Sequence, residues 1–124
     1  MTLFFEPADA VEERPRTGAE RCEVSVATGP DAVSVTVRGA LDMECVDRLR
    51  IALLQAITTG ARAAELRVDL TGVTFCDSTG LNELLRAHRR ALGEHRRMTV
   101  TGISDQVERL MKLTGTCDLF GLKR

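Results

Sequence analysis

The chain of 124 residues contains no Trp and no Tyr, and only four Phe. Proteins that bind single-stranded nucleic acid without sequence preference stack the bases on aromatic side chains, so this class of function is disfavoured. The net charge of −1 also lacks the basic excess that contact with a phosphate backbone requires. We therefore predict no direct DNA binding.

Long apolar runs are missing as well. No stretch approaches the ~20 apolar residues that a membrane span needs. Residues 1–16 have neither the basic start nor the apolar stretch of a secretory signal. We therefore expect a cytoplasmic protein with no membrane contact, and the length suits one compact domain.

Motifs that hold metals or exchange disulfides are also absent. The four cysteines, Cys22, Cys45, Cys76 and Cys117, lie far apart, and no CxxC pair or His-rich motif accompanies them. Because zinc sites and redox pairs depend on such spacings, we predict no metal and no cofactor. The cysteines are expected to be buried free thiols, as is usual in a reducing compartment.

Residues 1–20 are rich in Glu, Pro, Ala and Arg without periodicity, and we interpret them as a flexible N-terminal tail preceding a domain over 21–124. Apolar residues alternate over 22–28 and 32–39, and the intervening TGPD predicts a β-hairpin. Further strands are predicted over 65–70 and 98–102. Apolar residues at helical spacing follow the second, third and fourth predicted strands. Asp42 is expected to cap the first helix and Gly60 to close it, and Gly115 is expected to end the last helix. The second helix is expected to bury Leu81, Leu84, Leu85 and Leu92.

The predicted order is β-β-α-β-α-β-α, with residues 117–122 as a last short strand or a cover for the core. Strands separated by helices pair in parallel through right-handed crossovers. The fold class is therefore α/β, with a single mixed β-sheet of four to five strands and helices packed against it.

The stretch TFCDSTGLNELL, residues 74–85, places Asp77, Ser78, Thr79 and Gly80 between the third strand and the second helix. Enzyme chemistry fits it poorly. A cysteine phosphatase needs an Arg six positions after Cys76, where this chain has Asn82. An aspartic protease needs Asp-Ser-Gly or Asp-Thr-Gly and a second carboxylate, whereas here one residue intervenes, giving DSTG. A serine hydrolase needs G-x-S-x-G, and Ser78 lacks those flanking glycines.

Helix capping is the simplest role for these residues, since Asp, Ser and Thr all cap helices, for about 1 kcal/mol. A cap needs only one of them, however. The remaining hydroxyls lie at a helix N-terminus, where backbone N–H groups and the helix dipole favour an added anion. A phosphorylated side chain suits that position.

The pentapeptide DSTGL, preceded by LRVDLTGVTF, resembles the signature of STAS-domain anti-sigma factor antagonists, and VRGALD resembles their G-x-L-D segment at Asp42. The order of elements over about residues 22–122 is similar too. The resemblance implies a non-enzymatic protein that, when unphosphorylated, binds an anti-sigma factor with serine kinase activity and so releases a sigma factor. It implies phosphorylation at Ser78, reversal by a serine/threonine phosphatase, and ATP held by the kinase. By the same resemblance, Asp77, Thr79, Gly80 and Asp42 belong to the switch loop and partner surface.

Two alternatives remain open at the level of sequence. One is a non-switching STAS subunit of a larger assembly, such as a lipid-transport complex or a stress-signalling scaffold. The other is a small hydrolase acting through Ser78 or Cys76. The chain also departs from the family pattern, because it stops at LFGLKR where a C-terminal helix is common, and its N-terminal tail is longer.

Overall fold

The structure is a computed structural model that describes residues 22–58 and 65–121. The expected tail over residues 1–20 and the expected helix-closing Gly60 lie outside these ranges.

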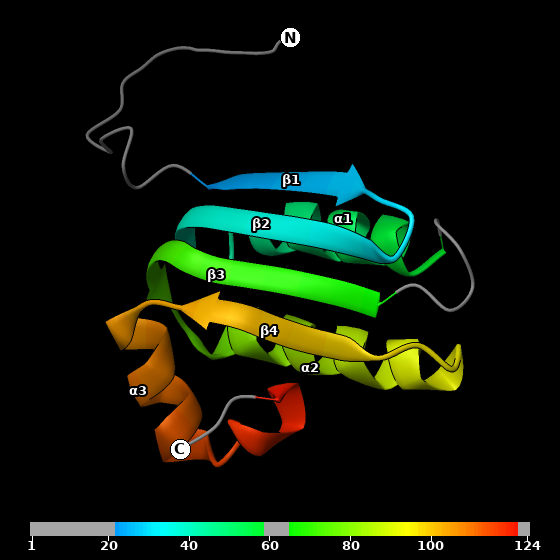
Figure 1. The fold of residues 1–124 in the computed structure, drawn as a ribbon. Coiled ribbons are helices and arrows are strands. Elements are labelled where there is room, and N and C mark those ends of the chain that lie inside the picture. The colour runs from blue at the N-terminus through cyan, green and yellow to red at the C-terminus, as the bar shows by residue number, and fades with distance from the viewer. Residues whose placement is uncertain (1–21, 59–64, 122–124) are drawn as a thin grey trace, which may run out of the picture.

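The centre of the fold is a four-stranded sheet with the strand order β1-β2-β3-β4 (Figure 1). The strands are β1 (Glu23–Thr28), β2 (Ala32–Leu41), β3 (Glu65–Cys76) and β4 (Met98–Ile103). β1 and β2 form the predicted antiparallel hairpin, whereas β2–β3 and β3–β4 are parallel. The mixed sheet is thus confirmed, and β3 runs six residues beyond the predicted strand because β2 continues to pair with it.

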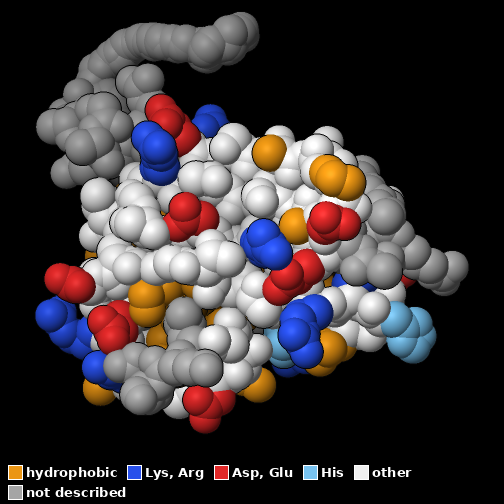
Figure 2. Space-filling model, viewed as in Figure 1, with side chains coloured by type: hydrophobic (Ala, Val, Ile, Leu, Met, Phe, Trp, Pro, Cys, Tyr) orange, Lys and Arg blue, Asp and Glu red, His pale blue; other side chains and the backbone are white. Residues whose placement is uncertain are grey.

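Two helices, α1 (Val46–Thr58) and α2 (Ser78–Gly93), cover one face of the sheet (Figure 1). α3 (Asp105–Thr114) packs near the end of β3. As predicted, it ends at Gly115, which the structure shows in the left-handed conformation. The opposite face of the sheet shows mainly uncharged polar side chains and backbone, with scattered charges (Figure 2). The alternation of buried and more exposed residues along β2 and β3 places the core between the sheet and the helices.

The C-terminal segment forms no fifth strand in the described part of the chain. Residues Asp118–Phe120 form a short 3₁₀ helix, η2, and Gly121 follows with a φ of 77°. Phe120 is fully buried in the core and contacts β4 through this turn. A single large apolar side chain therefore covers the core, which is the other role predicted for this segment.

Two predictions about buried residues are wrong. Leu92 is 57% exposed, because the last turn of α2 buries its neighbour Ala91 instead. Cys22 and Cys45 are joined in a disulfide with their Cα atoms 5.8 Å apart, whereas Cys76 and Cys117 are free and buried as predicted. The pairing arises because antiparallel β1 starts at the end of the sheet where β2 leads into α1, and sequence spacing does not reveal that proximity.

Arg96 has a structural role that the sequence did not show. Its guanidinium is buried and donates hydrogen bonds to the backbone carbonyls of Ala56 and Ile57 in the last turn of α1. Cations near the C-terminus of a helix also interact favourably with its dipole. Arg96, which follows α2 in the chain, therefore caps the C-terminus of a different helix, α1.

Candidate functional site

The candidate site lies where β3 passes into α2, beyond the end of β4. The pairing of β2 with β3 continues to Leu41 and Cys76, whereas the pairing of β3 with β4 stops at Leu70 and Ile103. The last residues of β3 therefore extend past the end of β4, and the DSTG segment that follows them lies at one end of the sheet.

The helix cap is Asp77. Its backbone is extended, and its carboxylate Oδ1 accepts a hydrogen bond of 3.1 Å from the backbone N–H of Gly80. Ser78 and Thr79 are the first two residues of α2, and Ser78 is exposed while Thr79 is half-buried. Neither hydroxyl is hydrogen bonded to a residue that the structure describes. Capping thus accounts for Asp77 and leaves both hydroxyls available.

Gly80 allows the start of α2 to lie directly against the end of β2. A Cβ at this position would lie 2.8 Å from both Leu41 Cγ and the Leu41 carbonyl oxygen, and 3.2 Å from Cys76 Sγ. Its φ is not in the left-handed region, so the requirement is one of space rather than of backbone conformation.

The same contact brings Asp42 to the site, because Asp42 follows Leu41. The Asp42 carboxylate accepts a hydrogen bond from the N–H of Glu44, and its carbonyl accepts from Cys45 and Val46. Asp42 thus shapes the turn that precedes α1, four residues before the helix begins, rather than capping the helix itself. The structure brings Asp42 and the DSTG segment to the same end of the sheet.

Gln106, at the start of α3, is a residue of this site that sequence reasoning missed. Its side-chain oxygen accepts from the backbone N–H of Cys76 at 2.8 Å, and its side-chain nitrogen donates to the Cys76 carbonyl at 3.0 Å. β4 ends before it reaches Cys76, so the Gln106 amide makes the hydrogen bonds that a neighbouring strand would otherwise make. These bonds fix Cys76, the residue immediately before Asp77. A Gln one position inside a helix carries no signal of such a contact.

Cys76 is unsuited to nucleophilic chemistry. Burial, followed by the nearby Asp77 carboxylate, raises the pKa of its thiol to about 12. The nucleophile is the thiolate, which is therefore scarce at neutral pH. The thiol donates instead to the carbonyl of Asp77.

The two histidines offer no base to Ser78. His88 lies ten residues further along α2, about 15 Å along the helix axis. Its ring contacts Phe120 edge-on with centroids 5.7 Å apart, which makes His88 a packing residue. His95 lies beyond the far end of α2, in the turn that leads to β4. The geometry therefore disfavours the hydrolase alternative.

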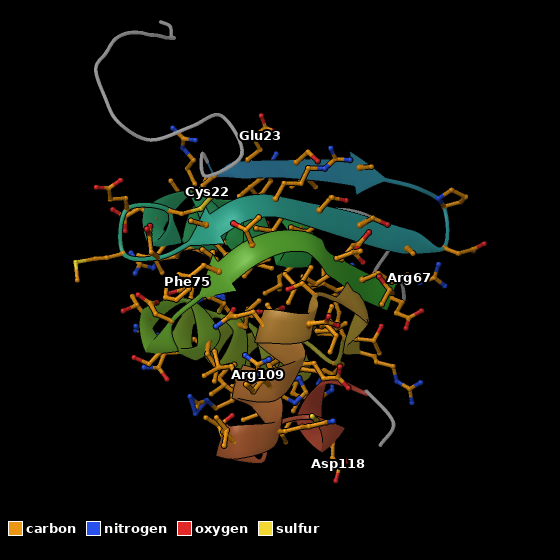
Figure 3. The ribbon with its side chains drawn as sticks, turned by 90° about the vertical axis from the view of Figure 1, so that its left-hand side faces the viewer. Cys22, Glu23, Arg67, Phe75, Arg109 and Asp118 are labelled. Atoms are coloured by element: carbon orange, nitrogen blue, oxygen red, sulfur yellow. A yellow bond between two sulfur atoms is a disulfide. The ribbon has the colours of Figure 1, made fainter. Side chains whose placement is uncertain are left out.

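Two exposed apolar side chains flank the site. Met43, in the turn after Asp42, is 72% exposed, and Phe75, next to Cys76, is 46% exposed. Figure 3 looks onto this end of the sheet and shows Phe75 on the surface where β3 ends. Apolar side chains next to polar groups at one surface are typical of a protein-binding site.

Among the described residues, no group of three or more His, Cys, Asp or Glu is placed to hold a metal ion. None of the helices in the described ranges has both the length and the apolar character to span a bilayer.

The fold and a family comparison define the class of the protein. Residues 24–121 match the family described as "Mlab, STAS domain". This match covers most of the chain, and the chain belongs to the STAS domain family.

Within that family, relatives of this chain include anti-sigma factor antagonists. The chain is 32% identical over 85 residues to the anti-sigma-B factor antagonist of Staphylococcus aureus, covering 68% of this chain and 77% of the relative. It is 29% identical over 93 residues to the protein of that name from Listeria monocytogenes, covering 75% of this chain and 80% of the relative. Among STAS proteins, the chain therefore belongs with the anti-sigma factor antagonists.

Solved structures agree with this placement. An anti-sigma factor antagonist from Mycobacterium paratuberculosis superposes with a TM-score of 0.74 at 25% identity, covering 86% of this chain and 89% of that one. The antagonist SpoIIAA in its unphosphorylated form has a TM-score of 0.66 at 19% identity, covering 84% of this chain and 89% of that one, which shows the common fold.

Proposed function

We propose that this protein binds an anti-sigma factor with serine kinase activity, releases a sigma factor by doing so, and is switched off by phosphorylation of Ser78. The observation that carries the proposal is that the residue that caps α2 is not the serine that α2 exposes. Asp77 makes the capping bond, and Ser78 presents an exposed hydroxyl that no described residue engages. The names of the relatives support the choice of partner.

Phosphorylation at this position changes the surface without requiring a new fold. A phosphate adds about −1.5 to −2 charges and three acceptor oxygens. The free N–H groups and dipole of a helix N-terminus accommodate an anion. On the surface, however, the phosphate stands beside the Asp77 carboxylate and at the same end of the sheet as Asp42. A partner that fitted a neutral hydroxyl then meets a concentration of negative charge.

The proposed partner surface comprises Asp42, Met43, Phe75, Asp77 and Ser78. Thr79 and Gly80 set the start of α2 beneath it. Met43 and Phe75 supply apolar area for binding. Asp42 and Asp77 orient the protein toward a basic surface on the kinase. In this proposal the protein is cytoplasmic and has no enzymatic activity of its own. The kinase holds ATP, and a serine/threonine phosphatase removes the phosphate.

The test compares Ser78→Ala, Ser78→Asp and the wild type in binding an anti-sigma factor kinase from the same organism, measured by calorimetry. Like charge at an interface costs several kcal/mol. We therefore expect Ser78→Asp to weaken binding about 100-fold, and Ser78→Ala to bind like the wild type but to accept no phosphate. Ser25→Asp, an exposed serine on β1, is the matched control and should leave affinity unchanged.

Equal binding by the wild type and the Ser78→Asp variant would contradict the electrostatic switch. Together with an absence of phosphate at Ser78 in native protein under every growth condition, it would favour a STAS subunit that binds its assembly constitutively.

A further inference from the structure

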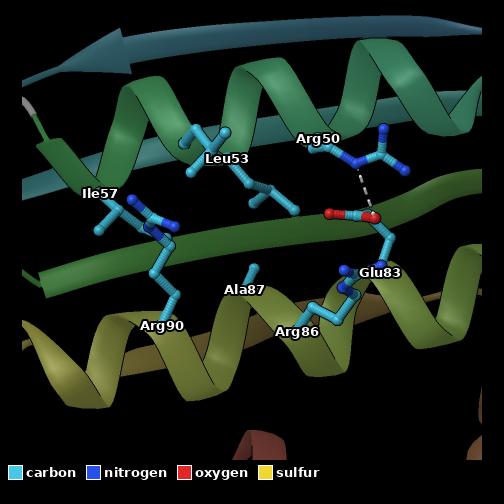
Figure 4. A pocket seen from close by; sticks show the side chains of 8 residues that line it. Arg50, Leu53, Ile57, Glu83, Arg86, Ala87 and Arg90 are labelled. Atoms are coloured by element: carbon cyan, nitrogen blue, oxygen red, sulfur yellow. Dashed lines mark hydrogen bonds and ion pairs between the residues drawn. The ribbon is translucent and has the colours of Figure 1, made fainter.

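A groove between α1 and α2 lies apart from the Ser78 site and has no role in the function proposed above. It has a volume of about 200 Å³. Two matching stripes line it, residues 50, 53, 54 and 57 on α1 and residues 83, 86, 87 and 90 on α2 (Figure 4). Both stripes follow the i, i+3, i+4, i+7 spacing of one helix face. The groove is therefore a regular product of two helices that run side by side.

The floor of the groove is apolar and its rim is basic. Leu53, Leu54, Ile57 and Ala87 form the apolar part, and three arginines surround it. Arg50 is occupied, since its guanidinium pairs with Asp47 at 3.0 Å and with buried Glu83 at 3.2 Å. The pair with Glu83 links the two helices at one end of the groove (Figure 4).

Arg86 and Arg90 provide the uncompensated charge. Both are exposed, and neither makes a hydrogen bond or ion pair with a residue in the described ranges. They lie one helical turn apart on α2, beside the apolar floor. The groove thus suits an apolar side chain accompanied by carboxylates. It is smaller than the 300–1,000 Å³ that sites for drug-sized ligands occupy, which favours a peptide side chain over a cofactor.

One segment of this chain has that chemistry. Residues 3–5 are Leu-Phe-Phe, and the first 13 residues carry four carboxylates (Glu6, Asp9, Glu12 and Glu13) and no Lys or Arg. We infer that residues 3–13 dock into the α1–α2 groove, with an aromatic side chain of the LFF stretch on the apolar floor and the following carboxylates facing Arg86 and Arg90.

The attachment of the segment supports this placement. Cys22 is bonded to Cys45, just before α1, and its carbonyl accepts a hydrogen bond of 3.0 Å from Arg48 of α1. From Cys45, the far end of the groove at Ile57 is about 18 Å along the helix. The 17 residues from Phe5 to Cys22 can extend to about 55 Å, so the tether reaches the whole groove. Tethering also raises the effective concentration of the segment to roughly the millimolar range.

The absence of Trp makes a direct test practical in the full chain. Phe5→Trp introduces a single fluorophore, and its emission and its quenching by acrylamide report whether residue 5 is covered. We expect a blue-shifted, protected tryptophan. Adding Arg86→Glu with Arg90→Glu should raise the quenching constant about fivefold, whereas Arg89→Glu, an exposed arginine of α2 that does not line the groove, should not change it.

A reciprocal exchange protects the test against a variant that misfolds. Glu6→Lys with Asp9→Lys should expose the tryptophan on its own. Combined with the two reversed arginines, it should restore protection, because the charges are again opposite. A tryptophan quenched equally in every variant would overturn the inference. So would a tryptophan whose protection from acrylamide is unchanged when Arg86 and Arg90 are reversed. If the protection depends on protein concentration, the groove binds a second copy of the chain instead. If the groove is otherwise open and captures an acidic peptide from another protein, it binds a partner instead.

Discussion

Replacing Gln106 by leucine tests whether a side chain of α3 fixes Cys76, the residue that precedes the DSTG segment. The variant removes both hydrogen bonds to the Cys76 backbone, of 2.8 Å and 3.0 Å. A hydrogen bond contributes about 0.5–1.5 kcal/mol net, and a buried group that loses its partner costs about 1–3 kcal/mol. Because Cys76 is buried, we expect the free energy of unfolding to fall by about 2–4 kcal/mol, measured by urea denaturation.

Hydrogen exchange localises this effect. The Cys76 amide should be protected in the wild type and should exchange much faster in the variant, while amides in the centre of β2 change only with global stability. Gln55 supplies the matched control, because it is exposed on α1 and Gln55→Leu should change stability by less than about 0.5 kcal/mol. A Gln106→Leu variant as stable as this control, with the Cys76 amide still protected, would refute the role assigned to Gln106.

The remaining predictions concern packing and protonation at the same site. Gly80→Ala places a methyl group 2.8 Å from Leu41 and should lower the free energy of unfolding by about 1–3 kcal/mol. Gly93→Ala meets nothing within 4 Å and should be neutral or stabilising by up to about 1 kcal/mol, so equal effects of the two substitutions in thermal unfolding would contradict the packing argument. Because the pKa of the Cys76 thiol is raised, the native state holds this proton more tightly than the unfolded chain, and its contribution to stability should decline above about pH 8.5. Alkylation with iodoacetamide at pH 8 should be far slower in native protein than in urea, and similar rates would show that Cys76 is not protected.

The sequence predicted the elements well where local chemistry decides them. The valines of β2 alternate because one face of the strand is buried, and the spacing of Leu49 and Leu53 follows one face of α1. The DSTG segment was predicted at a helix start because its polar residues suit a cap, and the structure assigns that cap to Asp77. Phosphorylation of Ser78 remains a prediction from family resemblance and exposure.

Contacts between distant segments were decided only by the tertiary structure. Gln106 reaches Cys76 because β4 ends before β3 does, and Cys22 meets Cys45 because an antiparallel strand returns to the start of α1. Arg96 likewise finds the last carbonyls of α1, forty residues earlier in the chain. Periodicity, capping and turn propensity are set by neighbours along the chain, so the sequence determined the elements, the type of fold and the position of Ser78 at the start of a helix. Which side chains hold that serine's loop in place depends on how far each strand extends, and that is fixed only when the sheet and helices pack together.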